Sequence, residues 1–153
     1  CQQAGFVATF VKINDFVEDL ILGVHDFTNS TNAAMTVALS ATAPAGEGSN
    51  PTADGNGVLA NVTQIAYTNL SSRAFTTVTP SLSSGTATVD LSDLVLTASG
   101  TVASFRYLYF YNDTPSSPAD PLVCHYDHGT TVSMVNTDTY TITIDAAGLF
   151  SIT

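Results

Sequence analysis

Residues 104–129 read SFRYLYFYNDTPSSPADPLVCHYDHG, and this stretch decides the fold class. Residues 105–111 alternate, but both sides of the run are mostly apolar, which indicates a central strand covered on both faces. The run ends at Asn112, where Asn, Asp, Thr and Pro favour a turn. A second strand is predicted over Leu122–His128, ending at Gly129. We therefore expect an antiparallel hairpin in the core.

One short helix is predicted near the N-terminus. Asp15 and Glu18 have the spacing of a capping box, and Gly23 suits the position after the last helical turn. Between them, Phe16, Val17, Leu20 and Ile21 recur at helical spacing, so they are expected to form an apolar stripe that docks on the sheet.

The rest of the chain is β-rich in pattern. Short alternating segments are separated by turn residues, and the expected strands are 34–42, 75–79, 86–91, 94–97, 131–134, 139–144 and 149–153. Residues 58–70 are expected to form one short turn leading into a strand, and residues 44–57 a long exposed loop. This spacing predicts a mainly β, single-domain antiparallel β-sandwich or barrel with one short N-terminal helix. Residues 1–11 form an N-terminal arm or first strand, and residues 12–153 the single β domain.

Charge excludes several classes of partner. The chain of 153 residues has 3 basic and 13 acidic residues, for a net charge of −10. Nucleic-acid binding needs Lys and Arg against phosphate, so no nucleic-acid partner is expected. The same acidity disfavours an anionic membrane surface, and no run of apolar residues is long enough for a transmembrane helix. Charged residues are only 10% of the chain, so the surface must be covered by Ser, Thr and Asn or by partners.

Candidate chemistry centres on residues 124–128, which read CHYDH. Strand alternation places Cys124 and His128 on one face and His125 and Asp127 on the other, which splits the ligands that a metal would need together. His25 could join them only through the tertiary structure. We therefore expect no metal, no cofactor and no catalytic site, although the residues of a catalytic triad need not be neighbours in sequence. A bridge between Cys1 and Cys124, within or between chains, is a minor alternative.

Arg106 is the one charge in the aromatic strand. The simplest interpretation is an ion pair with a carboxylate, and the alternative is a contact between subunits.

Several segments together resemble a family of small virion structural proteins of tailed bacteriophages. They are NDFVEDLILGVHDF (14–27), MTVALSATAP (35–44), IAYTNL (65–70), LVLTASGTVASFRYLYFYNDT (94–114), DPLVCHYDHG (120–129) and DTYTITIDAAGLFSI (138–152). The resemblance implies a non-catalytic component present in many copies, and most directly a capsid decoration (cement) protein.

The expected function is therefore binding to the outside of the major capsid protein shell, as a homotrimer that stabilises the head on the capsid exterior. The contact segments expected from exposure and apolarity are residues 1–10, the helix around 16–20 and the loop 44–57. The expected contact residues are Phe6, Phe10, Phe16, Leu20 and Arg106. The alternatives are a tail, neck or fibre component that contacts the host surface, or a surface lipoprotein or adhesin, because mature bacterial lipoproteins begin with Cys. An enzyme is the least favoured class.

Overall fold

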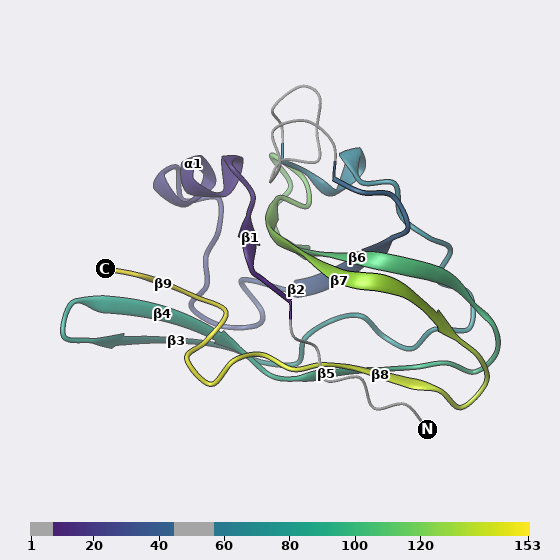
Figure 1. Cartoon of the computed structure of the whole chain (residues 1–153). Helices are drawn as coiled ribbons and strands as arrows, with labels where there is room; N and C mark the ends of the chain where they lie inside the picture. The colour runs from purple at the N-terminus through teal and green to yellow at the C-terminus, as the bar shows by residue number, and fades with distance from the viewer. Residues whose placement is uncertain (1–7, 45–56) are drawn as a thin grey trace.

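The computed structural model describes residues 8–44 and 57–153 and is mainly β (Figure 1). A four-stranded antiparallel sheet has the order β1-β7-β6-β2, and two smaller antiparallel sheets have the orders β3-β4-β9 and β5-β8. The elements in chain order are β1 (Val11–Lys12), α1 (Asp15–Ile21), β2 (Met35–Ser40), the 3₁₀ helix η1 (Leu59–Asn61), β3 (Val78–Ser83), β4 (Thr86–Leu91), β5 (Leu94–Thr97), β6 (Val102–Asn112), β7 (Leu122–Met134), β8 (Thr139–Ile142) and β9 (Phe150–Ile152).

The predicted sandwich-like class is confirmed, and the described residues form no closed barrel. The β5-β8 pair lies below the four-stranded sheet in the view of Figure 1. Phe105 of β6 meets Tyr140 of β8 edge to face, with 5.4 Å between ring centroids. The core therefore lies between these two layers, and the β3-β4-β9 sheet extends from one end of it (Figure 1).

The predicted central hairpin is confirmed, because β6 and β7 pair over most of their length. The predicted end of the second strand at Gly129 is wrong, since β7 continues to Met134 and includes the segment predicted as a separate strand. Gly129 has φ +87°, and the register of β6 against β7 shifts on both sides of Phe105. A glycine can take this backbone conformation inside an irregular strand as readily as in a turn, so the strand continues through Gly129.

The predicted strand in residues 58–70 is also wrong. Residues Leu59–Asn61 form the 3₁₀ helix η1, and the chain beyond it runs along the free edge of β2. The amide of Ile65 donates to the carbonyl of Leu39 at 3.0 Å. This irregular segment hides the edge of β2, all six residues of which are buried. The strand predicted at 75–79 lies later in the chain, as β3.

The helix is confirmed, but its predicted capping box is not. Asp15 is the first helical residue rather than the cap, and Asn14 occupies the cap position without a side-chain capping hydrogen bond. The carboxylate of Asp15 instead accepts a hydrogen bond from the amide of Gly57. The helix ends as predicted, with Gly23 at φ +72°. A contact from a distant segment has therefore replaced the local capping interaction.

The N-terminal arm joins the main sheet at β1, where Val11 pairs with His125 and Lys12 pairs with Cys124. Within residues 8–44 and 57–153, no helix is long and apolar enough to cross a membrane.

Candidate functional site

The β3-β4-β9 sheet, called the outer sheet below, has one apolar face and one polar face. Its registered pairs on one face are apolar, as in Leu82 opposite Ala87 and Ala87 opposite Ile152. On the other face the pairs are mostly Ser and Thr, as in Ser81 opposite Thr88 and Thr88 opposite Ser151. Side chains directly opposite each other share a face, so this alternation makes the sheet amphipathic. The apolar face consists of Val78, Pro80, Leu82, Ala87, Val89, Leu91, Phe150 and Ile152.

The apolar face is buried at its inner end and exposed at its outer end. Val78 and Leu91, next to the core, are each 5% exposed. Leu82 and Ile152, toward the tip of the β3-β4 hairpin, are 75% and 51% exposed. The hairpin turns at Ser84 and Gly85, whose φ angles of 50° and 86° suit a tight two-residue turn. The core therefore continues outward as an uncovered apolar row.

Helix α1 adds apolar surface beside the outer sheet. Its inner residue Phe16 packs edge to face on Phe150 of β9, with 5.1 Å between ring centroids. Outward from this contact, Val17 is 41%, Ile21 is 81% and Leu22 is 68% exposed. Figure 1 shows α1 and the outer sheet at the same end of the molecule. Exposed apolar groups gathered in this way are typical of a protein–protein contact surface.

The expected contact residues differ in how exposed they are in the structure. Phe6 lies outside the described residues, as does most of the loop 44–57. Phe10 is half-buried, and its ring meets that of Tyr126 edge to face at 6.0 Å. Phe16 is 3% exposed, so it supports α1 from the inside and cannot meet a partner directly. Leu20 is half-buried against the core. The exposed apolar residues of the helix region are Val17, Ile21 and Leu22 instead.

Arg106 forms the ion pair that its position predicted. Its Nε lies 2.7 Å from Oδ1 of Asp127, and a terminal guanidinium nitrogen lies 2.8 Å from Oδ2. This bidentate pair holds the pKa of the Asp127 carboxyl below its usual range. Arg106 therefore has a partner within its own chain.

The residues of the CHYDH segment do not converge. Cys124 is completely buried, and burial raises the pKa of its thiol. His125 is also buried, whereas Asp127 is exposed and paired with Arg106. Among residues 8–44 and 57–153, no three His, Cys, Asp or Glu side chains lie together as a metal site requires. A bridge to Cys1 falls partly outside the described residues.

His25 lies beneath α1 and not beside the CHYDH segment. It stacks on Phe27 with 5.2 Å between ring centroids, and its ring meets Phe16 at 5.3 Å. Its Nε2 lies 4.0 Å from Oδ2 of Asp19, and this nitrogen has no hydrogen-bond partner within the described part of the chain. Burial lowers the pKa of His25 to about 4, so the imidazole is neutral at neutral pH.

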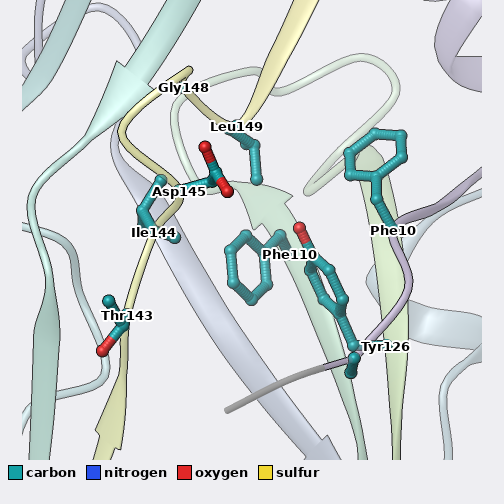
Figure 2. A pocket seen from close by; sticks show the side chains of 9 residues that line it. Phe10, Phe110, Tyr126, Thr143, Ile144, Asp145, Gly148 and Leu149 are labelled. Carbon is teal, nitrogen blue, oxygen red and sulfur yellow. The ribbon is translucent and has the colours of Figure 1, made fainter. Parts of the chain in front are cut away.

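A half-open pocket lies where the turn between β8 and β9 meets the main sheet (Figure 2). Its volume is about 430 Å³. Polar and apolar groups line it in comparable amounts, and its apolar and aromatic side chains include those of Phe10, Phe110, Tyr126, Ile144 and Leu149. Figure 2 shows the carboxylate of Asp145 above the Phe110 ring and the hydroxyl of Tyr126 beside it. The pocket therefore combines apolar side chains with one acidic group.

The turn that carries Asp145 is held in place by backbone contacts. One oxygen of its carboxylate accepts a hydrogen bond from the amide of Ala147 at 2.8 Å, and the amide of Gly148 donates to the Asp145 carbonyl at 2.8 Å. A side chain at Gly148 would place its Cβ 2.9 Å from the carbonyl oxygen of Val89, so the turn packs directly on β4. These contacts fix the position of the acidic group at the pocket.

The sequence carried a signal for the outer sheet that was used only in part, since the strand 86–91 was predicted from its alternation but the first strand was placed at 75–79. Residues 78–83 and 86–91 alternate between apolar and hydroxyl-bearing residues, which indicates one face toward a core. This pattern could not show that half of the apolar face would remain uncovered, because coverage depends on segments distant in sequence.

Comparison of the chain with protein-family models, with curated proteins and with solved structures found no match.

Proposed function

We propose that this protein is a bacteriophage capsid decoration protein that binds the outside of the major capsid protein shell and stabilises the head without catalysis. The observation that carries the proposal is the exposed half of the apolar face of the outer sheet. A regular apolar row along a hydrogen-bonded sheet is suited to binding a protein surface, and exposed patches of this kind mark interaction sites.

The choice of a phage shell as the partner is supported by the family resemblance of the segments quoted above. A small protein bound in many copies needs only a modest interface in each copy, because the contributions add over the shell. Copies of the protein are expected to associate as a homotrimer on the shell. The outer sheet and the exposed residues of α1 would then provide the contact with the shell protein.

The first test is the position and copy number of the chain in purified particles, measured by quantitative mass spectrometry and cryo-electron microscopy. The proposal predicts many copies distributed over the outside of the head. A few copies at the tail would favour a tail, neck or fibre component and overturn the proposal. Absence from particles would overturn it as well.

The second test removes the exposed apolar row with the double variant Leu82→Ser, Ile152→Ser. Burying a leucine or isoleucine completely contributes about 1.5–3 kcal/mol. Leu82 is 75% and Ile152 is 51% exposed, so binding can still bury most of one side chain and half of the other. The expected loss is about 2–4 kcal/mol of binding free energy, or about 30-fold to 800-fold in Kd.

The matched control is Ser81→Ala, Ser151→Ala, which changes the same strands on the opposite face. Both double variants are expected to unfold at nearly the wild-type temperature, because the substituted side chains contribute little to the core. Normal shell occupancy of the Leu82→Ser, Ile152→Ser variant would show that the outer sheet is not the contact.

A further inference from the structure

The pocket beside Asp145 combines aromatic and aliphatic side chains with a charged group. The aromatic and aliphatic side chains line it together with Thr143, and its charged group is a carboxylate on an exposed turn. One carboxylate oxygen accepts from the Ala147 amide, and the other has no hydrogen-bond partner among residues 8–44 and 57–153. A carboxylate oriented in this way can accept further hydrogen bonds from a ligand.

The charge of the pocket is not balanced by the protein's own basic residues. The chain has 3 Lys and Arg residues against 13 Asp and Glu. Lys12 lies on β1, Arg73 lies over the ring of Tyr67 at 3.6 Å, and Arg106 is paired with Asp127. None of the three lines the pocket. Charge complementarity therefore favours a cationic occupant.

The walls favour an occupant with an apolar body behind its charge. Phe10 and Ile144 are half-buried, so each offers apolar surface at the side of the pocket that solvent reaches. The rings of Phe10 and Tyr126 stand at 77° to each other, so a planar group placed on one ring meets the edge of the other. A guanidinium is planar, stacks on aromatic rings and offers several donors to a carboxylate, whereas an ammonium is a compact, strongly hydrated charge.

We propose that this pocket binds an arginine side chain of a partner protein, with the guanidinium on the Asp145 carboxylate and the aliphatic stem against Phe10 and Ile144. The pocket would give the interaction a specific anchor in addition to the apolar outer sheet. That the partner is a capsid shell protein rests on the proposed function, but the binding of arginine by the pocket does not.

The test uses Nα-acetyl-arginine methylamide as the probe, titrated into the isotope-labelled full chain and followed by NMR. Methyl signals of Ile144 and Leu149 should shift in a saturable way, with a Kd on the order of millimolar for so small a ligand. The matching citrulline derivative has nearly the same shape but no charge. It should bind about twofold to fivefold more weakly, because it lacks the ion pair.

The variant Asp145→Asn keeps an oxygen that can accept from the Ala147 amide while removing the charge. It should bind the arginine and citrulline probes equally weakly. The control is Asp138→Asn, because Asp138 is an exposed aspartate that likewise accepts a backbone hydrogen bond, from Val135 at 2.9 Å. This variant should bind arginine as the wild type does, and amide spectra of both variants report whether the fold is intact.

Equal binding of the arginine and citrulline probes to the wild-type chain would overturn the inference. So would the absence of shifts at Ile144 and Leu149 up to about 10 mM probe, or an unchanged response of Asp145→Asn. Failure of the protein to attach to phage particles would refute the proposed function alone, since the NMR titration contains no particle.

Discussion

Acidification below pH 6.5 should destabilise this protein through His25, and a His25→Gln variant should lose most of that effect. The His25 ring is stacked on Phe27 and contacts Phe16, and its side chain is completely buried. The side-chain nitrogen of Asn112 lies 3.4 Å from its Nδ1. Protonation would place a positive charge in this largely aromatic environment beneath α1.

The size of the effect follows from the difference between the folded and unfolded pKa values. Burial lowers the pKa of His25 from 6.5 to about 4. The folded state therefore favours the neutral imidazole, so the contribution to stability is complete above pH 6.5 and is lost as the pH falls toward 4. One pKa unit corresponds to about 1.4 kcal/mol, which makes the total loss about 3 kcal/mol, of which about 2 kcal/mol falls between pH 7 and pH 4.5.

The Asp19 carboxylate acts in the opposite direction, because its Oδ2 lies 4.0 Å from Nε2 and would attract a protonated imidazole. That attraction is limited, because burial and then the neighbouring carboxylates of Asp15 and Glu18 raise the pKa of Asp19. The 2 kcal/mol is therefore an upper figure for the range from pH 7 to pH 4.5.

The assay is urea unfolding of the wild type and of His25→Gln at several values between pH 7 and pH 4.5. The variant is expected to be less stable at pH 7, because a smaller polar side chain replaces the stacked ring. The decisive quantity is the difference between the two proteins in how much stability each loses on acidification. Other carboxylates titrate in both proteins and largely cancel in this difference. Parallel loss of stability in both would refute the reasoning.

Three further predictions concern stability and reactivity. In urea unfolding, Gly148→Ala should lower the free energy of unfolding by about 3 kcal/mol and Gly129→Ala by about 1 kcal/mol. Both glycines have positive φ, but of the two only Gly148 would place a Cβ against the backbone of β4, at 2.9 Å. Equal losses would contradict the close contact. Phe105→Ala should destabilise the protein by about 3–5 kcal/mol, since the Phe105 side chain of β6 is completely buried and packs on Tyr140 of β8. A loss of stability below about 1 kcal/mol would contradict the two-layer core. Cys124 should resist thiol reagents in the native protein and react only in denaturant, because it is completely buried. The measurement is peptide mapping by mass spectrometry, and labelling of Cys124 in the native protein would contradict the prediction.

Local patterns in the sequence were sufficient for the fold class and for the central hairpin. The run at residues 105–111 is apolar on both sides, which requires cover on both faces, and the structure places it in the middle of the main sheet. Gly23 ended the helix as predicted, since its backbone conformation is a local property. Gly129 was misjudged because glycine suits a bulge and a turn equally, and only pairing with β6 shows which one forms.

The family resemblance supplied the expected partner, but it did not identify the surface that would meet it. All the residues expected to make contact except Arg106 are apolar, and Phe16 has the same apolar character as Ile21. Only the packing of α1 against Phe27 and Phe150 shows that Phe16 faces inward while Ile21 is 81% exposed. Apolarity therefore does not identify a contact residue without its burial.

Alternation by itself determined that the outer sheet has an apolar and a polar face, because successive side chains in a strand point to opposite sides. The tertiary structure decided how much of the apolar face is covered, since Val78 and Leu91 meet the core while Leu82 lies beyond its reach. The pocket likewise exists only because the turn at residues 143–149 folds back toward Phe10 and Tyr126, which are distant in sequence. Local geometry determines which side chains share a face of a strand, whereas burial and pockets require contacts between segments far apart along the chain.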